Sequence, residues 1–178
     1  QCSQTKGFCG VTVAKLVEEN RLKLDDPVSR YIPEFAKMYI REKGPNGTYV
    51  LRPATNAITV RMCMNHSAGF PFELPNFEAM GGWSRRMPLR SVAATAAAQP
   101  LRFEPGTKVQ YSNVGIDIAA AVVEKVTGRR LDRAAEDLLF RPLGMADSSW
   151  GPVADDGRVV EMPIGVERGR RIGDRSRA

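Results

Sequence analysis

The sequence predicts a mostly α-helical fold built as one domain followed by a basic tail. Four stretches, residues 3–20, 89–99, 113–128 and 131–140, are typical of helices. Only residues 44–53 carry the signature of a tight turn with a short β-like run. The chain has 178 residues, 43% of them hydrophobic, which is enough for a buried core.

The first predicted helix begins at Ser3 and ends near Asn20. Serine is a favourable N-cap. Residues such as Phe8, Val11 and Leu16 make this helix apolar nearly all round for three turns. Such a pattern predicts a central, buried helix.

The middle of the chain alternates turns and short elements. Pro27 and Pro33 predict a turn-rich connection over residues 21–35, because proline interrupts regular structure. Thr59 is positioned to cap a short helix over residues 60–65. Residues 69–88 form a long loop rich in aromatic residues, proline and glycine.

The last two predicted helices have recognisable ends. In the first of them, apolar residues recur every fourth position from Val114 to Val126, and Gly128 fits a C-cap. Residues 131–140 predict one more helix, which Pro142 would stop.

Half of the formal net charge of +6 lies in the last thirteen residues, which contain five arginines. We therefore expect residues 151–178 to be a disordered or aberrant Arg-rich tail after a domain at 1–150. The tail lacks the interleaved aromatic residues that stack on bases, so no nucleic-acid partner is expected. No apolar run reaches the ~18 residues of a membrane-spanning helix.

The cysteines and the single histidine do not predict a metal site. Cys2, Cys9 and Cys63 lack a C-x-x-C spacing, and His66 has no second histidine to act with it. We expect Cys2 and Cys9 to be small core residues. No metal and no cofactor are predicted.

Ser3 and Lys6 lie three residues apart at the start of a predicted helix. This spacing puts both side chains on one face, one turn apart. A serine at a helix N-terminus can use its own N–H to stabilise an oxyanion, and a desolvated lysine can accept its proton. The alternative is that Ser3 is only an N-cap and that Lys6 points to solvent.

Tyr111 and Asn113 form a second candidate pair in the stretch PGTKVQYSN. At positions i and i+2 of an extended segment, both side chains can point the same way. A phenol could relay a proton near the serine, and an amide could orient a substrate carbonyl. The alternative is a core tyrosine followed by an asparagine that caps the next helix.

Taken in order, these stretches resemble a known family. SQTK with the following helix, ITVRMCMNHSAGF, FEPGTKVQYSNVGIDIAAAVVEKVTG and LLFRPLGMADSSW are similar to the serine β-lactamase and penicillin-binding-protein superfamily. The Y-x-N element points to its class C-like branch, which includes esterases and D-amino-acid peptidases. The resemblance covers residues 1–150 and implies an incomplete α/β serine β-lactamase/transpeptidase-like fold.

The resemblance also implies roles for the candidate residues. Ser3 would be the acylated nucleophile, and Lys6 its proton acceptor and electrostatic partner. Tyr111 would be the general base and acid, and Asn113 would hold a polar group of the substrate. His66 would have a structural role in a turn beside the site. The aromatic residues of the 69–88 loop either join the core or line the substrate cleft; they are Phe70, Phe72, Phe77 and Trp83.

One family element is missing from the sequence. Neither K-[ST]-G nor H-x-G, which the family carries on a strand facing the serine, occurs in these residues. We therefore expect a truncated member that contains the nucleophile helix and the helical region, with most of the β-sheet absent.

Two functions follow from the sequence. The first is a serine hydrolase that forms an acyl-enzyme on a small-molecule ester, amide or peptide, with a β-lactam or a D-amino-acid peptide as examples, and that is inactive in this form. The second is a non-catalytic binding or sensor module, or a truncated pseudoenzyme. The resemblance alone suggests an extracytoplasmic location, either periplasmic or secreted.

Overall fold

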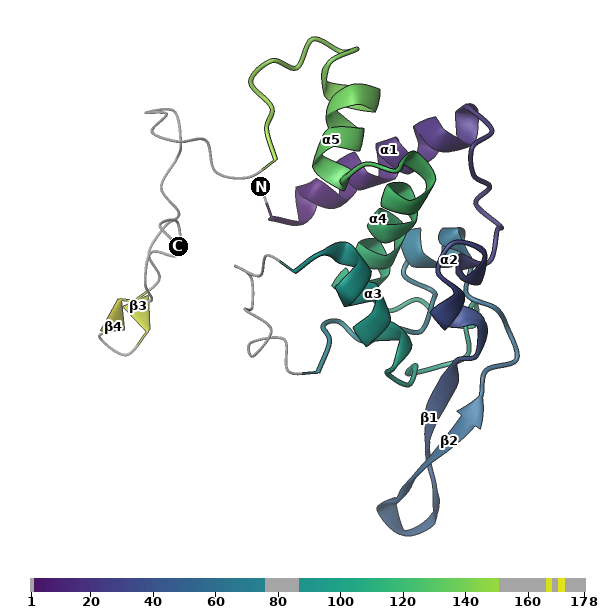
Figure 1. The fold of residues 1–178 in the computed structure, drawn as a ribbon. Coiled ribbons are helices and arrows are strands. Elements are labelled where there is room, and N and C mark those ends of the chain that lie inside the picture. The colour runs from purple at the N-terminus through teal and green to yellow at the C-terminus, as the bar shows by residue number, and fades with distance from the viewer. Residues whose placement is uncertain (1, 76–86, 151–165, 168–169, 172–178) are drawn as a thin grey trace. The chain divides into compact units, whose positions relative to one another are not determined.

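The computed structural model describes residues 2–75, 87–150, 166–167 and 170–171 (Figure 1). The chain divides into two compact units, Gln1–Ala146 and Asp147–Ala178. The helices of the first unit are α1 (Thr5–Glu18), α2 (Val60–Met64), α3 (Leu89–Ala97), α4 (Asn113–Thr127) and α5 (Leu131–Ala135). Its strands are β1 (Tyr39–Lys43) and β2 (Tyr49–Pro53).

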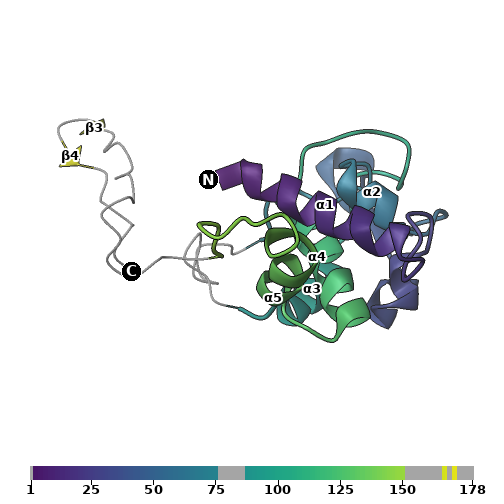
Figure 2. The same ribbon diagram turned by 90° about the horizontal axis from the view of Figure 1, so that it is seen from above.

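Helix α4 is the centre of the first unit. It contacts α1, α2, α3 and α5, and Figures 1 and 2 show these helices around it. Its Ile118, Val122 and Val123 are fully buried. The apolar repeat along α4 therefore faces neighbours on several sides, as expected for the helix that organises a core.

The N-terminal helix differs from its sequence prediction in two ways. It starts with a 3₁₀ turn, η1 (Cys2–Gln4), and Gln4 rather than Ser3 occupies the N-cap position of α1. It is also not buried all round, because Val11 is 50% exposed. The buried residues of α1 lie on one face; they are Cys9, Thr12, Val13 and Leu16. The described neighbours therefore bury only part of the apolar residues that the sequence places in this helix.

The strands form an antiparallel hairpin that extends from the helices (Figure 1). Its register pairs Tyr39 with Pro53 and Lys43 with Tyr49. Asn46 adopts a left-handed conformation with φ 58°, which confirms the predicted Asn-Gly turn. The sequence prediction missed β1, because its polar and charged residues gave no clear alternation.

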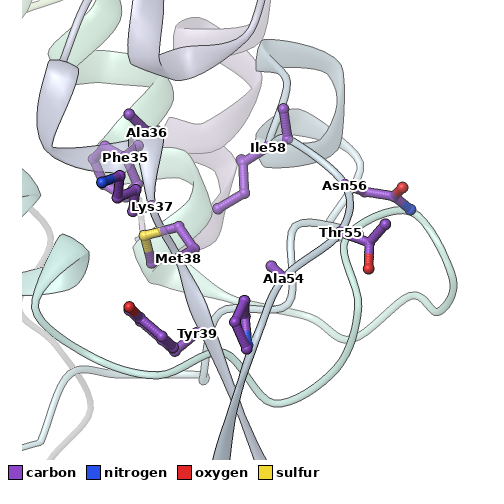
Figure 3. A pocket seen from close by; sticks show the side chains of 11 residues that line it. Phe35, Ala36, Lys37, Met38, Tyr39, Ala54, Thr55, Asn56 and Ile58 are labelled. Carbon is purple, nitrogen blue, oxygen red and sulfur yellow. The ribbon is translucent and has the colours of Figure 1, made fainter.

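A pocket of about 400 Å³ lies at the base of this hairpin (Figure 3). It is lined by residues 35–39 and 53–58. None of the four candidate site residues lines it, so this pocket is separate from the predicted chemistry.

Several predicted helix ends are confirmed. The Thr59 hydroxyl accepts a hydrogen bond from the backbone N–H of Met62 at 3.3 Å and caps α2. Gly128 ends α4 with φ 68°. The predicted last helix is present as α5 followed by a π-helical segment, η6 (Glu136–Phe140).

In the second unit, strand β3 (Val166–Glu167) pairs antiparallel with β4 (Arg170–Arg171). Most of the predicted Arg-rich tail lies outside the described residues. No helix in the described part of the chain is long and apolar enough to span a lipid bilayer.

Candidate active site

The structure brings together three of the four predicted site residues. The Lys6 ammonium donates a hydrogen bond to the Ser3 hydroxyl, with Nζ and Oγ 3.1 Å apart. The Tyr111 hydroxyl donates to the same Oγ at 2.8 Å. Ser3 is exposed. A hydroxyl held between an amine and a phenol, and open to solvent, is placed to react with a ligand.

The first turn of the chain creates the Ser3–Lys6 contact. Ser3 lies in the 3₁₀ turn η1, and Lys6 is the second residue of α1. Ser3 is not the N-cap of α1, and its oxygen accepts hydrogen bonds from the side chains of Lys6 and Tyr111. The positive end of the α1 dipole favours negative charge nearby.

Tyr111 is held by its backbone neighbours, 108 residues away from Ser3 in sequence. The Gln110 N–H donates to the His66 carbonyl at 2.9 Å. Ser112, which is 2% exposed, donates through its hydroxyl to the Pro71 carbonyl at 2.6 Å and accepts from the Gly115 N–H at 3.1 Å. Ser112 is therefore the N-cap of α4, and the alternative that Asn113 caps this helix is wrong.

Three side chains surround the Tyr111 ring. The Lys6 Nζ lies 5.0 Å from the ring centroid. The His66 ring lies at 4.6 Å in a tilted arrangement, and the Phe72 ring stacks at 6.1 Å. These contacts restrict the ring while leaving Tyr111 44% exposed.

The neighbouring cation makes Tyr111 more acidic. The Lys6 side chain, and then the hydrogen bond with Ser3, hold the pKa of Tyr111 below its usual range. A larger fraction of the phenol is therefore deprotonated at a given pH than in an isolated tyrosine. This is the direction needed for a proton acceptor beside a hydroxyl.

His66 holds the backbone next to Tyr111 through a hydrogen bond. Its Nδ1 accepts a hydrogen bond from the Ser112 N–H at 3.3 Å. Burial, and next the charge of Lys6, lower the pKa of His66, so the ring is held neutral. Its φ of 63° marks a sharp turn. These contacts fit the structural role expected of this histidine.

The Asn113 side chain contacts Glu73, a residue that the sequence did not indicate as part of a site. Its side-chain Nδ2 donates to Oε1 of Glu73, and its backbone N–H donates to the Phe72 carbonyl at 3.0 Å. Glu73 belongs to no motif and lies in a loop without helix or strand. Its acidic character within an aromatic, proline-rich loop was the only available signal.

The aromatic residues of the 69–88 loop divide between the two expected roles. Phe70 is 3% exposed and packs edge-to-face on Phe35 in the core. Phe72 is 48% exposed and stacks on Tyr111 beside the candidate site. Phe77 and Trp83 lie outside the described residues.

The cysteines do not take part in this site. Cys9 and Cys63 are buried and free. Burial raises the pKa of Cys9 to about 12 and raises that of Cys63 as well, so both stay protonated thiols. The side chain of Cys2 lies outside the described part. Among the described residues, no group of histidine, cysteine, aspartate or glutamate is arranged to hold a metal ion.

Comparisons with known proteins identify the family to which the chain is similar. The β-lactamase family model matches residues 2–171. A candidate D-alanyl-D-alanine carboxypeptidase of Escherichia coli strain K12 is 32% identical over 154 residues, which are 85% of this chain and 33% of that protein.

Solved structures show the same similarity. A D-stereospecific amidohydrolase from Streptomyces sp. has a TM-score of 0.59 and 30% identity, covering 79% of this chain and 40% of that one. EstCE1, described as a hydrolase with promiscuous acyltransferase activity, has a TM-score of 0.61 and 28% identity over 78% of this chain and 36% of that one. The chain spans about a third of the length of the curated relatives it matches.

Proposed function

Because the chain belongs to the β-lactamase family, we propose that it carries the acylation site of a serine hydrolase acting on an amide or ester. The observation that carries the proposal is the pair of hydrogen bonds from Lys6 and Tyr111 to the Ser3 hydroxyl. The β-lactamase family supports a β-lactam as the substrate class. The names of two similar proteins, a D-alanyl-D-alanine carboxypeptidase and a D-stereospecific amidohydrolase, support a D-amino-acid peptide.

In the acylation step, the Ser3 oxygen attacks the substrate carbonyl carbon. The Tyr111 phenolate takes the hydroxyl proton, and the Lys6 ammonium stabilises the phenolate; the alternative acceptor for that proton is Lys6 in the form of its neutral amine. The tetrahedral intermediate collapses, and the leaving group departs with the proton that Tyr111 returns. The product of this step is an ester between Ser3 and the acyl group.

In the deacylation step, a water molecule attacks the Ser3 ester. Tyr111 takes a proton from that water and then returns it to the departing Ser3 oxygen. The acid is released and the hydroxyl is restored. The same phenol therefore acts as base and acid in both half-reactions.

We also propose that the 178 residues by themselves turn over substrate slowly. Acyl transfer needs two donors to the oxyanion, and the Ser3 N–H is one of them. The family motifs K-[ST]-G and H-x-G, which accompany the second donor, do not occur in this sequence. Losing one oxyanion donor costs about 10²–10³ in kcat. The same absence favours the second candidate, a binding or sensor module without turnover.

The test is a time course of leaving-group release from a chromogenic ester and a chromogenic cephalosporin. We expect release of up to one equivalent per chain, followed by slow turnover, and loss of both phases in Ser3→Ala. Ser29→Ala, a half-buried serine on another element, is the matched control and keeps the initial phase. An initial phase that survives in Ser3→Ala contradicts the proposal.

A further inference from the structure

The hairpin of β1 and β2 has an outward face made of aromatic, apolar and basic side chains. In an antiparallel pair, directly opposed residues lie on the same face, and successive residues alternate between the two faces. The register therefore places six residues on one face; they are Tyr39, Arg41, Lys43, Tyr49, Leu51 and Pro53. All six are exposed, and none of them is acidic.

The opposite face of the hairpin holds the core contact and the acid. Ile40 lies on that face, is 2% exposed and belongs to the hydrophobic core. Glu42, the one acidic residue of the two strands, lies on the same face as Ile40 and accepts a hydrogen bond from Arg52 at 2.8 Å. Arg41 and Lys43 therefore give the outward face a positive charge that no acid of the face offsets.

Much of the exposed surface of this hairpin is apolar. On the outward face, Tyr39 is 46%, Tyr49 58% and Leu51 61% exposed. Val50 is 48% exposed on the opposite face, so three consecutive residues of β2 present apolar groups to solvent. A sheet face that meets only water normally carries polar residues, and contiguous exposed apolar residues mark an interaction surface.

The shape and chemistry of the hairpin select the kind of partner. It projects away from the helices (Figure 1), and the Arg41 guanidinium lies 4.7 Å from the centroid of the Tyr49 ring. A peptide is normally held in a groove or added along a strand edge, whereas here the cations and the apolar groups share an exposed face. Tyrosine rings favour the lipid–water interface, and lysine and arginine attract anionic headgroups.

We propose that this outward face binds the surface of anionic lipid bilayers, with Tyr49 and Leu51 at the level of the headgroups and Arg41 and Lys43 against the lipid phosphates. The inference goes beyond the hydrolase function proposed above and does not depend on the reactivity of Ser3. Binding is peripheral and reversible, because two cations and a few apolar side chains supply less than a stable membrane anchor needs.

The experiment measures how the protein partitions onto lipid vesicles, by co-sedimentation. The protein carries Ser3→Ala, so that lipid esters are not a substrate, and the vesicles are phosphatidylcholine alone or a two-to-one mixture with phosphatidylglycerol. We expect the anionic vesicles to bind the protein at least about tenfold more strongly at low salt. This advantage should shrink at high salt, because salt screens the attraction between the cations and the headgroups.

Charge variants separate the hairpin from the net charge of +6 that the whole chain carries. The double variant Arg41→Gln/Lys43→Gln should weaken partitioning by about 30-fold, since each cation at an anionic surface contributes about fivefold. The double variant Lys23→Gln/Lys125→Gln removes the same charge from exposed positions outside the hairpin. It is the matched control and should weaken partitioning by less than about threefold.

An apolar variant tests the second component of the face. Leu51→Ser should weaken binding to anionic vesicles by about tenfold, because the leucine loses its contact with the lipid. Leu143→Ser is the matched control, since Leu143 is 66% exposed and lies outside the hairpin. It should leave binding unchanged, and near-UV circular dichroism confirms that each variant is folded.

Four results overturn the inference. Equal weakening by the two charge variants would assign binding to the net charge of the chain. Equal binding to neutral and anionic vesicles would exclude recognition of the headgroups. Binding of a poly-glutamate peptide without binding of vesicles would assign the face to an acidic protein partner. Dimerisation that Leu51→Ser abolishes, without binding of vesicles, would assign it to a second copy of the chain.

Discussion

Lys6 stands one turn after Ser3 and donates to its oxygen, so its substitution tests the proton transfer directly. We expect Lys6→Arg to slow acylation by about 10²–10⁴-fold, because a guanidinium keeps the charge but cannot accept a proton at neutral pH. The measurement is the rate of the initial release phase. A rate near that of the wild type would show that Lys6 is no proton acceptor.

The lowered pKa of Tyr111 predicts how the acylation rate depends on pH. Its pKa is lowered mainly by Lys6, and the reactive form of a base is the deprotonated one. The acylation rate should therefore rise with pH and become constant above the pKa of Tyr111. The inflection should lie below the usual tyrosine pKa of about 10. Replacing Lys6 with methionine should move this inflection upward. An inflection that stays in place in Lys6→Met, or that persists in Tyr111→Phe, assigns it to another group.

At the scale of single residues, the sequence predicted some contacts and missed others. Ser3 and Lys6 are close in sequence, so helical spacing alone places them together. The approach of Tyr111 across 108 residues has no local signal and came only from the family resemblance. Glu73 was missed because it carries no motif and becomes notable only through its contact with Asn113.

At the scale of elements, Ser112 links helix α4 to the loop that carries Phe72. Ser112→Ala should cost about 1–2 kcal/mol of unfolding free energy, because it removes the N-cap of α4 and leaves the Pro71 carbonyl without its donor. It should also slow acylation, since Tyr111 is the preceding residue. The measurements are chemical denaturation and the initial release rate.

Thr59→Ala is the matched control for Ser112→Ala. It removes the N-cap of α2, which carries none of the proposed catalytic residues. We expect a stability loss of about 1 kcal/mol and an unchanged acylation rate. If both variants slowed acylation equally, the link between Ser112 and the site would be wrong.

Gly115 sets the close approach of α4 to α2. A Cβ at this position would lie 2.9 Å from the backbone oxygen of Cys63, which is too close for any side chain. Gly115→Ala should lower the unfolding free energy by about 1–3 kcal/mol. Gly10→Ala in α1 is the control, since its Cβ meets only the Met64 side chain at 3.5 Å. It should be neutral or stabilising by up to about 1 kcal/mol; comparable losses in both variants would contradict this account.

The helix ends were the most predictable elements, because caps depend on single residues. Thr59 and Gly128 act as expected. The Ser3 cap was wrong because Ser3 joins the 3₁₀ turn η1, which puts Gln4 at the N-cap position of α1. Strand β1 was missed because its stability comes from pairing with β2, which is not visible in its own residues.

At the scale of the molecule, the sequence predicted the helical region and its family, but it predicted the helix over residues 3–20 to be central, whereas α4 is the central helix in the structure. The family model matches residues 2–171, and the chain spans about a third of its curated relatives. The proposed site lies wholly within the first unit, since its residues come from η1, α1, the 66–75 segment and residues 111–113 at the start of α4. Because all the proposed site residues lie in one unit, the reactivity of Ser3 can be tested on this 178-residue chain.

The most direct test of the central claim is the location of a covalent adduct. The chain is treated with a fluorophosphonate probe, which reacts with activated serines, and the adduct is mapped by peptide mass spectrometry. We predict one adduct per chain on Ser3, absent in Ser3→Ala and strongly reduced in Tyr111→Phe. An adduct on another serine, or no adduct on a chain shown to be folded, would contradict the assignment of Ser3 as the nucleophile.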